Sequence, residues 1–349
     1  TLPDASKWTI ILGSFLLIGF LFVFLPIYQA QRYPERLFEE TNFKQPHPET
    51  IGLLSVRSFW QVYRQGILVF FQSLGAIIRP VFSLAGSIGI GLIALRAFLY
   101  PEDLTFVYWF DWASHFSFML GYAFSTPIDL FISILWVGLF AYIFLVVYHY
   151  LLIKSGLTNM SWNTYVRKMF LRSSIVFLIL LLPIYLLPWY VLLPTVVIYP
   201  FLLYLPFSIT YPNHSIKQGI KKGFKYGARS YITLFILSLL GLATVAVVFQ
   251  PIAFVISIEN EVPDLLDLIV KGISPFLDKA GLDSVFWTNL FREFTYLIAL
   301  IFSLVFWFIL LTLSYFSTLE KREALNLKKE GRYFGERSRL KEYIETEGE

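Results

Sequence analysis

The chain contains no cysteine and only four histidines among its 349 residues. The lack of cysteine excludes disulfide bonds, thiolate nucleophiles, iron–sulfur clusters and zinc sites built on cysteine. The histidines, His47, His115, His149 and His214, are far apart and none has the HExxH spacing. The sequence therefore predicts no metal site and no cofactor.

Charged residues are also scarce. They make up 15% of the chain, whereas hydrophobic residues make up 57%. A soluble domain has about 25% charged and about 45–50% apolar residues. Because a water-soluble core cannot hold this surplus of apolar side chains, the composition excludes a disordered chain and an ordinary soluble enzyme. It predicts an all-α, polytopic helical membrane protein.

Apolar runs long enough to cross a bilayer, which takes roughly 20 residues in a helix, define about seven predicted transmembrane helices. They are Trp8–Gln29, Val81–Leu99, Ile128–Ile153, Ser174–Leu187, Val191–Thr210, Thr233–Ile258 and Phe294–Phe316. The first run is too long for a signal peptide and no small-residue cleavage site follows it, so we interpret it as a retained span.

The segments that connect these spans alternate between segments rich in Lys and Arg and segments with few or none. The basic segments are 32–79, 154–172, 217–229 and 321–341, whereas 100–127 has no Lys or Arg and 259–287 is acidic. By the positive-inside rule, this alternation predicts an N-terminus outside and a C-terminus in the cytoplasm. We divide the chain into an N-terminal span with its linker (1–55), a six-span membrane domain (56–316) and a charged cytoplasmic tail (317–349). We place it as a multi-pass protein in a bacterial cytoplasmic (inner) membrane.

Three amphipathic basic segments each precede a pair of spans, which suggests a threefold unit of surface helix and helical hairpin. Their basic residues recur at helical spacing, and we expect them to contact the headgroups of anionic membrane lipids. They are Arg57, Arg64 and Arg79 in the first segment, Arg167, Lys168 and Arg172 in the second, and Lys217, Lys221, Lys225 and Arg229 in the third.

Three stretches carry a family resemblance: SFWQVYRQGILVFFQSLGAIIRP, SIKQGIKKGFKYGARSYITLFILSLL and YFSTLEKREALNLKKEG. They resemble a broad family of uncharacterised bacterial membrane proteins, common in Bacteroidetes. That family is similar to the membrane domain attached to some glycerophosphodiester phosphodiesterases. The resemblance implies a helical domain of the cytoplasmic membrane, and it carries over no catalytic residue.

Two features predict contacts with other helices or proteins. In the second span, Ala85 with Gly89 and Ser87 with Gly91 place small residues four apart, which lets another helix approach closely. The aromatic loop 100–126 contains Trp109, Trp112 and Phe116, which we interpret either as interfacial anchors or as a surface for a partner subunit.

Prolines and isolated charged residues in the predicted spans are two further features to interpret. Six prolines, Pro183, Pro188, Pro194, Pro200, Pro206 and Pro212, recur through the fourth and fifth spans. They either bend helices structurally or mark a broken helix of the kind found in transporter binding sites. The charged or polar residues Arg96, Asp129, His149, Arg292 and Glu293 all fall near predicted span ends, where we expect them to snorkel to the interface.

These observations favour a non-catalytic integral membrane subunit, or an assembly or scaffold factor of a membrane complex, with protein partners in the membrane. A transporter or permease component centred on residues 174–212 is the alternative. A lipid-modifying enzyme is a third possibility, for which Asp111 and His115 are the only acid–histidine pair at helical spacing. The balance of Glu against Lys and Arg in the tail argues against nucleic-acid binding.

Overall fold

The computed structural model describes residues 53–99, 127–186, 199–212, 214–241 and 284–323. These residues are helical or lie in turns and connections, and none of them forms a strand. The all-α fold class is therefore confirmed for the part of the chain that the structure describes. The elements are α3 (Phe59–Val81), the π-helical turn η1 (Phe82–Gly86), α4 (Ser87–Leu99), α6 (Pro127–Lys154), α7 (Trp162–Leu186), α9 (Leu205–Ile209), α10 (Ile216–Arg229) and α13 (Ser284–Glu323). A further apolar helix covers Tyr231–Gly241.

Within these residues, three helices are long and apolar enough to cross a membrane: Phe59–Leu99, Pro127–Lys154 and Glu293–Glu323. They contain the second, third and seventh predicted spans. The first predicted span lies outside the described residues, and the fourth, fifth and sixth lie partly outside them. The number of spans and their orientation therefore remain predictions.

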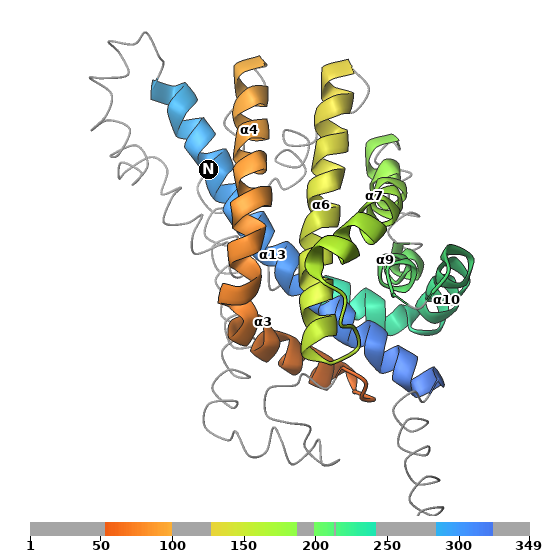
Figure 1. The fold of residues 1–349 in the computed structure, drawn as a ribbon. Helices are drawn as coiled ribbons and strands as arrows, with labels where there is room; N and C mark the ends of the chain where they lie inside the picture. The colour runs from red at the N-terminus through yellow and green to blue at the C-terminus, as the bar shows by residue number, and fades with distance from the viewer. Residues whose placement is uncertain (1–52, 100–126, 187–198, 213, 242–283, 324–349) are drawn as a thin grey trace, which may run out of the picture.

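The first basic segment and the span after it form one bent helical unit. Figure 1 shows α3 running across the lower end of the molecule and α4 rising from it. Pro80 lies inside the helix and η1 follows directly, and proline and π-turns are both established causes of helix kinks. The carbonyl of Pro80 accepts hydrogen bonds from the hydroxyls of Ser83 and Tyr142, at 3.0 and 3.2 Å. The carbonyl oxygen of Pro80 is therefore hydrogen-bonded at the bend, where the chain turns from α3 into α4.

Two of the three basic helices start in the same way. Ser58 before α3 and Ser215 before α10 each form a capping box with the glutamine three residues later. Such boxes satisfy backbone N–H groups that a helix start leaves without an intrahelical partner. Before α7, the hydroxyl of Ser161 hydrogen-bonds that of Thr164 at 2.9 Å. The starts of α3 and α10 are therefore alike, and the threefold organisation stays a prediction.

The second unit differs from the prediction in one respect. The sequence predicted a basic surface helix, followed by a separate span from Ser174. The structure shows the continuous helix α7 instead, running from Trp162 to Leu186. No glycine or proline separates Arg172 from the apolar residues after it, so nothing in the local chemistry ends the helix there.

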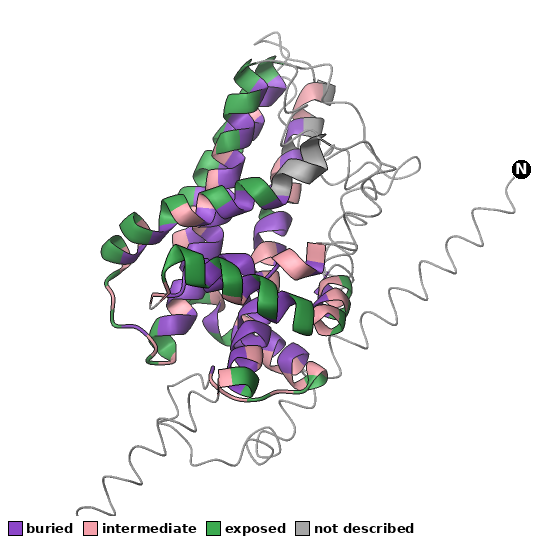
Figure 2. Ribbon diagram, turned by 90° about the vertical axis from the view of Figure 1, so that its right-hand side faces the viewer, coloured by how far each residue is buried: buried purple, intermediate pink, exposed green. Residues whose placement is uncertain are grey.

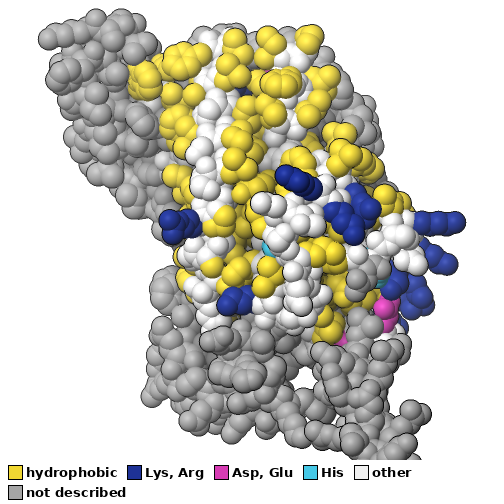
Figure 3. Space-filling view, viewed as in Figure 1, with side chains coloured by type: hydrophobic (Ala, Val, Ile, Leu, Met, Phe, Trp, Pro, Cys, Tyr) yellow, Lys and Arg dark blue, Asp and Glu magenta, His cyan; other side chains and the backbone are white. Residues whose placement is uncertain are grey.

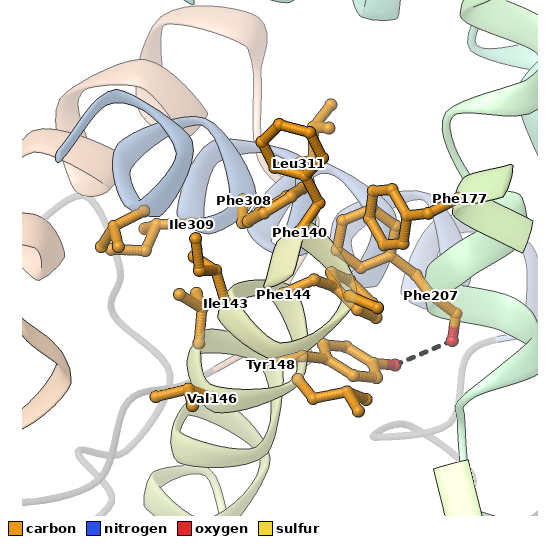
Figure 4. Close-up of a cluster of buried hydrophobic side chains, with 14 of the residues drawn as sticks. Phe140, Ile143, Phe144, Val146, Tyr148, Phe177, Phe207, Phe308, Ile309 and Leu311 are labelled. Carbon is orange, nitrogen blue, oxygen red and sulfur yellow. Dashed lines mark hydrogen bonds between the residues drawn. The ribbon is translucent and has the colours of Figure 1, made fainter. Parts of the chain in front are cut away.

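The core lies between α6, α7, α9 and α13, and aromatic rings fill much of it (Figure 4). Phe144 on α6 is fully buried, and its ring centroid lies 5.0 Å from that of Phe207 and 5.4 Å from that of Phe308. The hydroxyl of the buried Tyr148 donates to the carbonyl of Phe207 at 3.1 Å, which satisfies the polar tip of this side chain. Figure 2 shows buried residues on the inward faces of the helices and exposed residues on the outward faces.

The apolar segment Tyr199–Ile209 contains two of the six prolines. A turn at Leu203 and Tyr204 separates its two helical parts, and Pro206 lies in the first turn of the second part, α9. Proline is tolerated there because its missing N–H would have no helical partner anyway. This placement favours the structural role for Pro206. Pro188 and Pro194 lie outside the described residues.

Candidate functional site

A glycine stripe on α10 brings two backbones into direct contact. Gly219, Gly223 and Gly227 are four residues apart and all are buried. A Cβ atom on Gly219 would lie 2.7 Å from Cα of Ile209, and one on Gly227 would lie 2.2 Å from the carbonyl oxygen of Phe201. The helix α10 therefore lies flat against the segment that contains α9. Sequence analysis missed this stripe, although its GxxxGxxxG spacing is a known signal for close helix approach.

Lys222 joins the middle of α10 to the end of α13. Its ammonium lies 2.7 Å from the Glu323 carboxylate and donates to Nε2 of His214 at 3.1 Å. The other ring nitrogen of His214, Nδ1, donates to the carbonyl of Ser208 at 3.0 Å. The hydroxyl of Tyr226 donates to the same Glu323 carboxylate. We call Lys222, His214, Tyr226 and Glu323 the polar junction.

Hydroxyl groups continue this network toward the core. The hydroxyl of Tyr204 lies 2.6 Å from that of Ser314 and 3.3 Å from that of Thr318, and Thr318 also contacts the hydroxyl of Ser230 at 3.1 Å. These contacts tie the segment around α9 and the end of α10 to α13. Together the two networks hold α9 and α10, which are neighbours in the sequence, against the distant helix α13.

His214 makes the polar junction sensitive to pH. Burial lowers the pKa of its imidazole below the ordinary value of about 6.5 and the ammonium of Lys222 lowers it further, whereas the hydrogen bond to Ser208 opposes the shift. The Glu323 carboxylate also opposes it, and the ring of Tyr211 packs against the imidazole.

Because the pKa of His214 is lower in the folded chain, the unfolded chain binds the proton more readily. The contribution of His214 to stability is therefore complete above pH of about 6.5 and is lost as the pH falls below that value. We expect acidification to increase hydrogen exchange of the α10 amides, after correction for the intrinsic rate, and His214→Gln to reduce this increase. An equal increase in both proteins would contradict this prediction.

The predicted headgroup residues differ in how far they face outward. Arg79, Arg167 and Lys168 are exposed, whereas Arg64 and Arg172 are half-buried. On α10, the exposed basic residues are Lys217, Lys221, Lys225 and Arg229. Figure 3 shows Lys and Arg side chains across the middle of one face and gathered at the edge where Figure 1 places α10, with mostly hydrophobic side chains above them.

Arg57 forms hydrogen bonds with other groups of the same chain. Its guanidinium donates to the carbonyls of Leu53 and Ser55, at 2.8 and 3.1 Å, and to the side chain of Gln65. Its backbone N–H donates to the hydroxyl of Ser317 on α13 at 2.8 Å. Burial lowers the pKa of its guanidinium to about 10, which leaves it protonated at neutral pH. These contacts give Arg57 a role in holding the start of α3 against α13, so we leave it out of the proposed headgroup contacts.

The two small-residue pairs predicted in the second span, which lie in η1 and α4, face different ways. Ala85 and Gly89 are buried, and a Cβ atom on Gly89 would lie 2.9 Å from Leu297 of α13. Ser87 and Gly91 are exposed, and a Cβ atom on Gly91 would meet no heavy atom within 4 Å. The first pair thus lies at a helix contact inside the chain, and the second pair faces outward.

The charged residues near the predicted span ends do not snorkel as expected. Arg96 on α4 and Asp129 on α6 form an ion pair at 3.1 Å, and their side chains are only 2% and 4% exposed. Glu293 on α13 is also buried. His149 donates from Nε2 to the carbonyl of Met160 at 3.0 Å and stacks on Tyr165. The outward-snorkelling interpretation was wrong for these four side chains because neighbouring helices, and for His149 the connection between α6 and α7, supply polar partners or cover them.

Several predicted residues lie outside the described residues. They include Trp109, Trp112 and Phe116 of the proposed partner surface, and the pair Asp111 and His115. Across the ranges that the structure describes, no group of three or more His, Cys, Asp or Glu side chains could hold a metal ion.

Comparison with models of known families, with curated proteins and with solved structures gave no match to this chain. The resemblance to the bacterial membrane family and to the phosphodiesterase membrane domain therefore stays a prediction. The function has to be argued from the geometry of the chain itself.

Proposed function

We propose that this chain is a non-catalytic integral membrane subunit or scaffold of a complex in the bacterial cytoplasmic membrane. The observation that supports this role most directly is the aromatic core between α6, α7, α9 and α13. Phe144, Tyr148 and Phe207 are at most 1% exposed. Side chains packed this closely fill the space between helices that a transport pathway or a substrate pocket would need, and they suit a rigid body that acts through its outer surfaces.

The proposed arrangement has seven spans, with the N-terminus outside and the C-terminus in the cytoplasm. The end of α4 and the start of α6 lie at the same end of the molecule in Figure 1, and α3 and the end of α13 lie toward the other end. The exposed cations described above lie on α3, α7 and α10, away from the upper ends of α4 and α6. This distribution agrees with the positive-inside rule applied to the sequence.

Purification in a mild detergent tests the proposed role. We expect the tagged full chain to bring down a companion protein at a fixed stoichiometry, measured by native mass spectrometry. Replacing Trp109, Trp112 and Phe116 together by alanine should remove the companion, because aromatic clusters dominate binding hot spots.

A matched control replaces two exposed aromatic residues of α3, Trp60 and Phe71, which are 57% and 55% exposed. This control should keep the companion. A monodisperse monomer that carries a bound small solute would contradict the scaffold role and would support the transporter alternative.

A further inference from the structure

The helix α10 presents three different faces along its length. The glycine stripe forms the inner face, against the segment from Phe201 to Ile209. Ile216, Ile220 and Phe224, also four residues apart, are 49%, 42% and 46% exposed. Lys217, Lys221 and Lys225 each follow one of these apolar residues, so a lysine face runs directly beside the apolar face.

We propose that α10 docks in the plane of an anionic lipid leaflet through these two outer faces. Ile216, Ile220 and Phe224 enter the boundary between headgroups and acyl chains, and the lysine face contacts the lipid phosphates. This inference rests on the proposed membrane location and adds a specific lipid-binding surface to it.

Charge complementarity identifies the occupant. Residues 214–232 contain five Lys or Arg and no Asp or Glu. Lys222 is the exception among the five, because it faces Glu323 in the polar junction. Each ammonium at a leaflet surface contributes about 1 kcal/mol, which corresponds to about a fivefold change in partitioning to anionic lipid.

The glycine stripe determines the orientation of this surface. With backbones in contact at Gly219, Gly223 and Gly227, α10 cannot rotate about its axis without moving into the segment around α9. The capping box at Ser215 and the ion pair from Lys222 to Glu323 hold its start and its middle. The apolar and lysine faces therefore point outward together, as a fixed part of the protein body.

The absence of cysteine allows a direct test with single-cysteine variants of the full chain. We would label Phe224→Cys and Lys221→Cys with an environment-sensitive fluorophore and reconstitute each protein in nanodiscs. One set contains phosphatidylcholine alone, and the other also contains phosphatidylglycerol. Phe131→Cys on α6 serves as a reference, because Phe131 is 59% exposed on a candidate span.

We expect the label at 224 to show blue-shifted emission and shielding from a water-soluble quencher, more strongly with phosphatidylglycerol. The label at 221 should remain accessible to the quencher. Replacing Lys217, Lys221 and Lys225 by glutamine should abolish the response of the 224 label to phosphatidylglycerol, whereas replacing them by arginine should keep it.

Three results would overturn the proposal. In the first, the aqueous reagent quenches the label at 224 in both lipids while the label at 131 is protected. The docking of α10 would then be wrong, whereas the proposed membrane location would still hold. The label at 224 could be shielded equally in both lipids and in detergent, which would mean that protein covers this face. If the label at 131 were also water-accessible, the proposed membrane location would fail as well.

Discussion

Replacing Gly227 by alanine should loosen α10 from the protein body. The new Cβ atom would lie 2.2 Å from the carbonyl oxygen of Phe201 and 2.9 Å from its carbonyl carbon, so the backbone itself must move. Overpacking of this kind costs about 1–3 kcal/mol, and strain on backbone atoms places this site at the upper end. The better helix propensity of alanine offsets up to about 1 kcal/mol of that cost. Thermal unfolding in detergent and hydrogen exchange of α10 measure the effect.

Gly91→Ala is the matched control. Gly91 also lies inside a helix, but a Cβ atom there has no heavy atom within 4 Å. Only the propensity effect remains, so Gly91→Ala should leave stability unchanged or raise it by up to about 1 kcal/mol. If Gly227→Ala were as stable as Gly91→Ala, the close backbone contact would not exist.

Replacing Asp129 by leucine should destabilise the contact between α4 and α6. The guanidinium of Arg96 would stay buried while the carboxylate 3.1 Å away is removed. Breaking a buried ion pair by removing one partner costs about 3–5 kcal/mol. The expected result is a lower unfolding temperature in detergent and a larger aggregated fraction by size-exclusion chromatography.

The double variant Arg96→Met with Asp129→Leu separates the ion pair from packing. Replacing both members of a buried pair by apolar side chains is often close to neutral, so the double variant should recover most of the lost stability. If the double variant were less stable than Asp129→Leu alone, Arg96 would contribute to the fold independently of Asp129.

Local patterns along the sequence predicted the helical elements well. The spacing of Arg57, Arg64 and Arg79 indicated a surface helix before the second span, and α3 occupies that segment. The sequence did not predict that α3 continues through η1 into α4. A π-turn depends on a shift in backbone hydrogen bonding that residue spacing does not encode.

The polar junction could not be predicted in the same way. His214 and Lys222 are near each other in the sequence, but Glu323 is about a hundred residues further along the chain. Arg96 and Asp129 are likewise separated by more than thirty residues, among which there is no Lys or Arg. Pairing between distant charges follows from how helices pack, and one sequence carries no direct signal for it.

The glycines of α10 show a signal that was present but overlooked. They recur every four residues, as do Lys217, Lys221 and Lys225. The sequence analysis predicted only the lysine face from this spacing. The two patterns describe opposite sides of one helix. Small residues at this spacing in an amphipathic segment therefore indicate a face that packs closely against another backbone.

The turn η1 also determines how α4 is oriented about its own axis. In a helix each residue advances the direction of its side chain by about 100°. A π-turn holds one residue more than an α-helical turn, so deleting one residue between Phe82 and Gly86 would restore a regular α-helix and leave the side chains of α4 facing the same way. Deleting Ile88 from the regular helix that follows would instead rotate the rest of α4 by about 100°, so that Gly89 would swing away from Leu297 and Arg96 away from Asp129. Homologues that keep both contacts should accordingly accept a one-residue deletion in η1 but none between Ser87 and Arg96.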